Sequence, residues 1–168
     1  MARLGLTNHI YMYIHIYMTK RTRTESRSTL AALPCACANL RRAARAVSRL
    51  YSRALRAEHI EITQFTLLMT LDRAGEVSQG KLGKLLALDS TTLTRVLELL
   101  RKKGWVREKE GDDRRFRMIQ LTAAGRAKLM QSMPLWKKAQ HRVQEALGEQ
   151  NMSQLREMLE VVTAMAAG

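Results

Sequence analysis

The stretch "SQGKLGKLLALDSTTLTRVLELLRKKG" (78–104) decides the fold together with "WVREKEGDDRRFRMIQLT" (105–122), which follows it directly. Ser78 is suited to begin a short helix, and Asp89 or Ser90 to begin a second helix that ends at Gly104. Two short helices around a tight turn, the second polar at its N-terminal end, are typical of a helix-turn-helix. The β-prone runs "WVREKE" and "FRMIQLT" flank a Gly-Asp-rich turn, which predicts a hairpin. A hairpin in this position is typical of a wing.

The segment before this stretch has helical periodicity. In "CACANLRRAARAVSRLYSRALR" (35–56), apolar residues recur at the spacing of one helix face, and arginines recur every four residues on another. Like charges at that spacing repel each other, so we expect acids, a partner chain or phosphate to offset them, and for most of these arginines the alternative is a solvated helix face. A second helix is predicted with Thr63 as its cap and its end at Gly75.

The segment after the stretch is also helical in pattern. We expect a long helix from Thr122 through Leu147, kinked or broken just before Pro134, since proline removes a helix hydrogen bond. A last helix with a broad apolar face is predicted to begin at Asn151 or Ser153. The fold class is therefore mainly α with a small β-hairpin wing (α+β).

The composition favours a polyanionic partner. The 168 residues carry 29 Lys and Arg against 15 acids, a formal charge of +14. Nucleic acid fits this charge, and an anionic membrane surface is the alternative. Aromatic residues make up only 5% of the chain, which favours duplex DNA over stacked single strands. No apolar run approaches the length of a membrane helix, and two neighbouring cysteines form no disulfide framework, so we expect a cytoplasmic protein.

The N-terminal segment is unlike the rest. "NHIYMYIHIYM" (8–18) alternates as a strand does, but no partner strand or turn is near. Residues 1–33 are expected to be disordered or peripheral, with Met18 as the natural start and residues 1–17 as an upstream extension.

These elements, in this order, resemble the MarR family of winged helix-turn-helix transcriptional regulators. The resemblance covers about Cys35 to Ala166 and is most specific in the wing, where Asp113, Arg115, "LT" (121–122) and Gly125 match the family signature. It implies one domain over 34–168, with 63–121 as the winged helix-turn-helix lobe and 34–57 plus 122–167 as dimerisation helices. It also implies a homodimer on a palindromic operator, and an unpaired apolar last helix agrees with a second copy.

The resemblance also implies DNA contacts. Arg115 corresponds to the wing-tip arginine that enters the minor groove, and Asp113 to the acid that orients it; the alternative is a solvated turn. Arg114 and Arg117 are expected at phosphates. We expect exposed residues of the two short helices to contact base edges in the major groove and the DNA backbone beside it. The alternative is that these residues only cap a helix or face solvent. They are Ser90, Thr91, Thr92, Thr94, Arg95, Lys81, Lys84 and Arg101.

Two cysteines stand at the start of the first long helix, where the helix dipole and nearby arginines favour a reactive thiolate. In the hydroperoxide-sensing branch of the family, Cys37 corresponds to the reactive cysteine and Tyr51 to one accompanying tyrosine, but Arg41 replaces the other. Cys37, and less so Cys35, is a candidate redox sensor; the alternative is a small buried hydrophobe. Zinc-ligand spacing and catalytic constellations are absent from the sequence, so we expect no metal, no cofactor and no enzyme.

The sequence therefore predicts a dimeric DNA-binding transcriptional regulator that represses from a palindromic operator. A small lipophilic or phenolic ligand, or cysteine oxidation, is expected to release it, and no membrane partner is expected. The alternative is an architectural duplex-DNA-binding protein without sequence preference.

Overall fold

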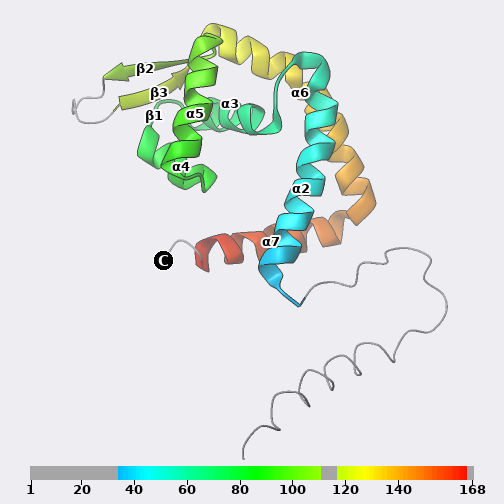
Figure 1. Ribbon diagram of the computed structural model, residues 1–168. Helices are drawn as coiled ribbons and strands as arrows, with labels where there is room; N and C mark the ends of the chain where they lie inside the picture. The colour runs from blue at the N-terminus through cyan, green and yellow to red at the C-terminus, as the bar shows by residue number, and fades with distance from the viewer. Residues whose placement is uncertain (1–33, 111–116, 166–168) are drawn as a thin grey trace, which may run out of the picture. The chain divides into compact units, whose positions relative to one another are not determined.

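The computed structural model describes residues 34–110 and 117–165. The chain divides into two units, Met1–Arg41 and Arg42–Gly168, and the first contributes Pro34, Cys35 and the start of helix α2 to the described residues. The second unit is mainly helical with one small antiparallel sheet, which confirms the predicted fold class (Figure 1). No helix within the described ranges is long and apolar enough to cross a membrane.

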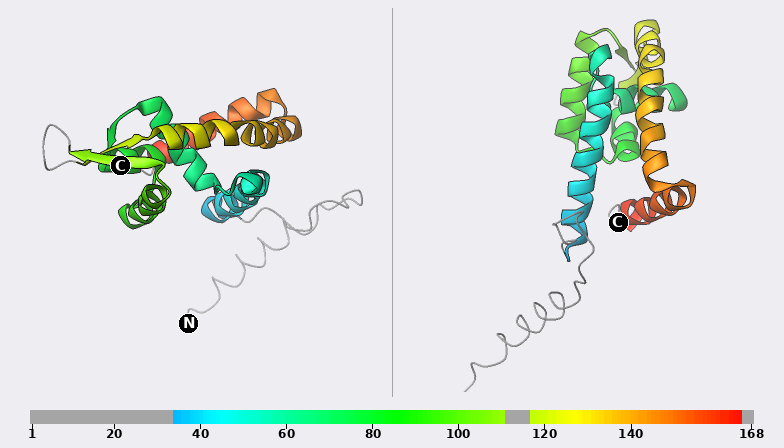
Figure 2. Two further views of the ribbon diagram at one scale, coloured as in Figure 1. Left: turned by 90° about the horizontal axis from the view of Figure 1, so that it is seen from above. Right: turned by 90° about the vertical axis from the view of Figure 1, so that its right-hand side faces the viewer.

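The elements follow the order that the sequence predicted, with two additions, η1 and β1. The elements are α2 (Ala36–Leu55), a 3₁₀ turn η1 (Arg56–Glu58), α3 (Ile62–Ala74), β1 (Val77–Ser78), α4 (Gln79–Leu86), α5 (Ser90–Lys102), β2 (Val106–Glu110), β3 (Arg117–Leu121), α6 (Ala123–Leu147) and α7 (Glu149–Met165). We call the part from α3 to β3 the winged lobe. Figure 2 shows the β2–β3 hairpin extending away from the helices of this lobe.

The sheet has the strand order β1-β3-β2, with both pairs antiparallel. Val106 lies opposite Leu121 and Glu108 lies opposite Ile119, which confirms the predicted hairpin. Strand β1 was not predicted, because its two residues are too few to show alternation. It pairs with Met118 and Ile119 of β3 and thereby ties the hairpin to the lobe.

The predicted start of α3 was wrong. Glu61, rather than Thr63, is the N-cap residue, and its side chain accepts from the backbone of Gln64 while the Gln64 side chain accepts from the Glu61 backbone. This reciprocal capping box satisfies two backbone donors, whereas the side chain of a threonine cap alone satisfies one. Gly75 ends the helix as expected, with φ 71°.

The predicted start of α7 was also wrong. Neither Asn151 nor Ser153 caps it, because α7 begins at Glu149 directly after Gly148. Gly148 has φ 76°, a left-handed conformation that glycine adopts without strain, so the chain turns in one residue.

Pro134 lies inside α6 without breaking it. The helix is continuous over 25 residues, so of the expected kink or break the break does not occur. Figure 1 shows α6 changing direction between its yellow and orange parts, as a proline-associated bend does. Two residues before the proline, the hydroxyl of Ser132 donates to the carbonyl of Lys128 at 2.8 Å, so this buried side chain is satisfied within the helix.

Helix α3 supplies the centre of the core. Its Phe65, Leu67 and Leu68 are fully buried and pack with side chains from the other elements of the lobe and from α2 and α6. Phe65 stacks on Trp136 of α6 with ring centroids 5.8 Å apart. The core therefore joins α6 to the winged lobe.

The junction between β3 and α6 brings two backbone segments into close contact. Thr122 donates through its backbone N–H to the carbonyl of Trp105 and through its hydroxyl to the carbonyl of Gly104, at 2.6 Å. The same hydroxyl accepts from the N–H of Gly125 at 3.0 Å. A Cβ on Gly125 would overlap the carbonyl oxygen of Trp105, so only glycine fits there. This geometry gives a physical reason for the "LT" and glycine of the wing signature.

We predict that Gly125→Ala destabilises the protein by about 3 kcal/mol or more, because backbone must move to admit the methyl group. Thermal or urea unfolding followed by circular dichroism measures this. Gly80→Ala is the matched control, since its Cβ meets nothing within 4 Å. There we expect no loss, and a gain of up to about 1 kcal/mol from helix propensity. Equal stability of the two variants would contradict the tight junction.

Candidate nucleic-acid interface

Helices α4 and α5 form a helix-turn-helix whose turn is closed by backbone bonds. Ser78 caps α4 by accepting from the N–H of Lys81. Ala87 ends α4 in the left-handed region at φ 48°, and the N–H of Leu88 bonds to the carbonyl of Gly83 at 3.0 Å. Asp89 caps α5. The predicted caps at Ser78 and Asp89 are therefore confirmed.

Helix α5 separates a buried face from a polar one. Leu93, Leu97 and Leu100 are at most 2% exposed and fix the helix in the lobe. The five α5 residues expected in the major groove are all exposed: Ser90, Thr91, Thr92, Thr94 and Arg95. Lys81 and Lys84 of α4 are exposed as well. Such a face can present hydrogen-bond donors and acceptors to base edges.

Two of these threonines have internal partners that the sequence analysis missed. The hydroxyl of Thr92 donates to Asp89 at 2.7 Å, and the Gln79 side-chain amide donates to the hydroxyl of Thr94 at 3.0 Å. Gln79 therefore fixes a side chain of α5 from the first residue of α4. The sequence offers only one indication of this role for Gln79, namely its position directly after the Ser78 cap.

The Asp89 carboxylate is stabilised by these capping bonds. The backbone N–H of Thr92 and then its hydroxyl hold the pKa of Asp89 below its usual value. Asp89 is therefore ionised at neutral pH at the N-terminus of α5, where a helix favours negative charge.

The strands of the wing contain an ion-pair cluster that the sequence did not predict. Glu108 of β2 pairs with Arg101 of α5 at 2.7 Å and with Arg117 of β3 at 3.0 Å. Both arginines were expected at the DNA backbone. Lys109 pairs with Glu76 at 3.3 Å across the sheet edge. The expected wing-tip residues Asp113, Arg114 and Arg115 lie outside the described residues.

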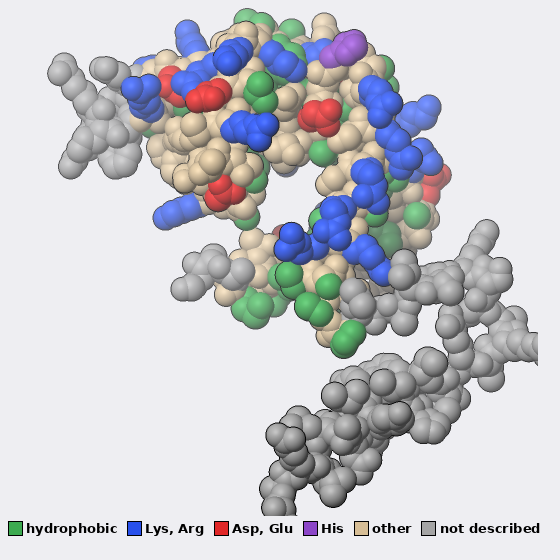
Figure 3. Space-filling model, viewed as in Figure 1, with side chains coloured by type: hydrophobic (Ala, Val, Ile, Leu, Met, Phe, Trp, Pro, Cys, Tyr) green, Lys and Arg blue, Asp and Glu red, His purple; other side chains and the backbone are tan. Residues whose placement is uncertain are grey.

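Positive side chains gather on the face seen in Figure 3, over the winged lobe and along α2. Arg45, Arg49 and Arg53 of α2 are exposed, and in the described part of the chain none of them has an ion pair. Arg53 donates to the carbonyl of Arg49, at 3.2 Å. The expected acids that would offset this stripe are therefore not supplied by the described residues.

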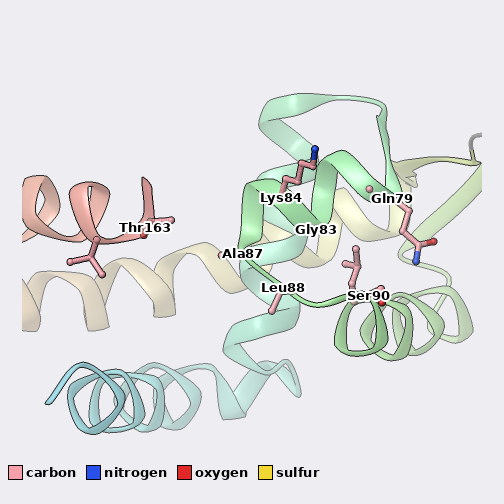
Figure 4. A pocket seen from close by; sticks show the side chains of 10 residues that line it. Gln79, Gly83, Lys84, Ala87, Leu88, Ser90 and Thr163 are labelled. Carbon is pink, nitrogen blue, oxygen red and sulfur yellow. The ribbon is translucent and has the colours of Figure 1, made fainter. Parts of the chain in front are cut away.

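A groove of about 1060 Å³ lies between the helix-turn-helix and α7. Figure 4 shows Thr163 of α7 on one side and residues of α4 and the α4–α5 turn on the other. Its lining is mostly apolar, including Leu88, Leu93 and Val162, but Lys84 and Ser90 also contribute. An apolar compound in this groove would therefore touch side chains of the candidate DNA-binding surface.

The cysteines lie where the sequence placed them. Cys35 directly precedes α2 and Cys37 is in its first turn, and both thiols are free and exposed, so neither fills a core position in this chain. Tyr51 is buried, its hydroxyl donates to the side-chain oxygen of Gln140, and burial raises its pKa. The described residues contain no cluster of three or more His, Cys, Asp or Glu that could hold a metal ion.

Comparison with known proteins points to one family. The MarR family profile matches residues 60–116. The M. tuberculosis transcriptional regulator MosR, in complex with DNA, is 36% identical, with a TM-score of 0.72 over 79% of this chain and 96% of that chain. A single-residue mutant of E. coli MarR, complexed with operator DNA, is 26% identical, with a TM-score of 0.67 over 73% of this chain and 89% of that chain.

Among curated proteins, the transcriptional repressor MprA of Escherichia coli (strain K12) is 31% identical over 107 residues. That match covers 62% of this chain and 61% of the relative, so the chain spans about three fifths of its length.

We predict that Asp89→Asn removes part of the acid sensitivity of folding. Because the pKa of Asp89 is lower in the folded than in the unfolded chain, its carboxylate stabilises the fold above the unfolded value of about 4. This contribution disappears as the pH falls through the folded value. Thermal midpoints measured between about pH 2 and pH 7 should fall less steeply below pH 4 in the variant than in the wild type. If the thermal midpoints of the variant and the wild type fall in parallel with pH, protonation of Asp89 does not contribute to the acid sensitivity of folding.

Proposed function

Because the chain belongs to the MarR family, we propose that it is a sequence-specific DNA-binding regulator of transcription. In this proposal it acts in the cytoplasm as a homodimer on a palindromic operator and represses the promoter that the operator overlaps. The observation that carries the proposal is the exposed polar face of α5 beside a hairpin wing, on a chain of formal charge +14. The described relatives are transcriptional regulators rather than enzymes.

We assign direct base contacts to the start of α5. Arg95 is exposed and has no ion pair among the described residues, so its guanidinium is available to bind guanine through two hydrogen bonds. Thr91 and Thr94 are placed to contact a thymine methyl group or a phosphate. Lys81 and Lys84 contact the DNA backbone and position the lobe. From the wing signature, Arg115 is assigned to the minor groove, oriented by Asp113.

We assign dimerisation to residues 34–57 and 122–167, and the winged helix-turn-helix to 63–121. Helix α7 has no buried residue in the single chain. Its exposed apolar side chains include Leu155, Leu159 and Val162, which recur at the spacing of one helix face. A contiguous apolar face of this kind marks an interaction site, and a second copy of α7 has the matching surface.

We propose two routes by which the operator is released. The groove between α4 and α7 supports binding of a small apolar ligand, and the exposed Cys37 supports oxidation. Hydroperoxide added to the DNA complex separates the routes. Release that is lost in Cys37→Ser, and kept in Cys35→Ser, assigns oxidation at Cys37; a complex that survives hydroperoxide removes the oxidation route.

We predict that Arg95→Ala weakens binding to the preferred duplex by about 1–3 kcal/mol, and that it relaxes selectivity at one base pair of each half-site. The duplex is first selected with the wild-type protein from a random pool, and affinities are then measured at fixed salt against a scrambled duplex. Lys137→Ala on α6 is the control, because it removes the same unit charge from an exposed position outside the lobe. A wild type that binds both duplexes equally would favour the architectural alternative.

We predict that Leu159→Glu converts the dimer to a folded monomer, because it places a charge on the apolar face of α7 without disturbing a buried contact. Sedimentation velocity gives the mass, and circular dichroism confirms the helices. Gln154→Glu introduces the same charge at an exposed polar position of α7 and should leave the dimer intact. A Leu159→Glu protein that still sediments as a dimer would remove α7 from the interface.

A further inference from the structure

Glu108 occupies an unusual position for an acid. It lies in the middle of β2, directly opposite the fully buried Ile119 and two residues from the buried Val106. Residues opposite each other in an antiparallel pair share one face of the sheet, so Glu108 belongs to the face that carries the core residues. Its side chain is only 16% exposed. A carboxylate held this far from water must be neutralised by partners.

The partners of Glu108 come from two other elements. One carboxylate oxygen lies 2.7 Å from Nη1 of Arg101, in the last turn of α5, and the other accepts from Nη1 of Arg117 on β3 at 3.0 Å. A single side chain therefore ties the end of α5 to both strands of the wing. The Arg101 side chain is 35% exposed, so this pair is shielded better than an ordinary surface ion pair.

The cluster has a cost for a DNA-binding surface. A negative charge beside the wing weakens attraction to phosphate, and it occupies one N–H group on each of two arginines that could bind phosphate. Apolar side chains at these positions could stabilise the lobe equally well. What the cluster adds is a fixed orientation, since a carboxylate that binds two planar guanidinium groups restricts where all three elements lie.

We propose that Glu108 is a positioning residue for DNA recognition: it locks the wing against the C-terminal end of α5 through Arg101 and Arg117. This inference rests on the proposed function. The arginines keep their remaining N–H groups free of Glu108, and the carboxylate orients them toward the DNA backbone. The relative placement of α5 in the major groove and of the wing beside it is then set before DNA binds, which lowers the cost of ordering on binding.

The test is Glu108→Gln, which keeps the shape of the side chain but cannot neutralise two arginines. We expect affinity for the selected duplex to fall about tenfold, while affinity for the scrambled duplex stays equal or rises, because the protein gains one positive charge. Glu76→Gln is the matched control. It makes the same charge change in the same lobe and breaks one exposed ion pair to β2, but leaves the link to α5 intact. It should lose no selectivity.

The outcomes separate the possible roles of Glu108. If affinity for both duplexes rises together, Glu108 is only an unfavourable charge and the inference is overturned. If both fall together with the thermal midpoint, Glu108 is only structural and the inference is equally overturned. If the wild-type protein binds both duplexes equally, the proposed function itself is wrong. This result is obtained before any variant is compared.

A measurement without DNA completes the test. Amide hydrogen exchange in β2, β3 and the last turn of α5 should be faster in Glu108→Gln than in Glu76→Gln, because the lock restrains these segments relative to each other. Unchanged exchange in Glu108→Gln would overturn the lock.

Discussion

The close approach of Gly125 to the carbonyl of Trp105 is the constraint on which the rest of the structure depends. It brings the start of α6 against the turn that follows α5, and the hydroxyl of Thr122 closes the contact by donating to Gly104 and accepting from Gly125. The end of α5 and the first turn of α6 are therefore held as one unit. Because α7 continues from α6, this junction also determines where the helices assigned to dimerisation leave the winged lobe.

Features determined by neighbouring residues could be predicted from the sequence. The caps at Ser78, Asp89 and Thr122 each use a bond to a residue three positions along, so residue type and spacing were sufficient. The prediction for α3 failed because Glu61 is a less typical cap, and its capping box depends on Gln64 as well. The start of α7 was missed because Gly148 ends one helix and lets the next begin at once.

Features that join distant segments could not be predicted. Strand β1 forms because it pairs with β3, and a segment of two residues has no pattern from which that pairing could be predicted. The expected α4 and α5 contact residues are exposed, with Arg101 half-buried, because amphipathic spacing alone decides which side of a helix faces water. The same spacing does not predict which of these residues bond to other side chains of the protein. The bonds of Gln79 to Thr94 and of Glu108 to two arginines span separate elements and leave no periodic signal.

The groove beside α4 lies where a bound compound could affect both DNA binding and the dimer. Its lining includes Ser90 of the proposed base-reading helix and Val162 and Thr163 of α7, which also carries the proposed dimer surface. In a dimer built through α7, the spacing of the two lobes depends on how each lobe sits against this helix. A compound that fills the groove in only one spacing must shift the population toward that spacing. If the other spacing binds the operator, the compound and the DNA weaken each other's binding by the same factor. This coupling requires no contact between the compound and the DNA. It requires a winged lobe that is rigid enough to move as one body, and the Gly125 junction and the Glu108 cluster give the lobe that rigidity.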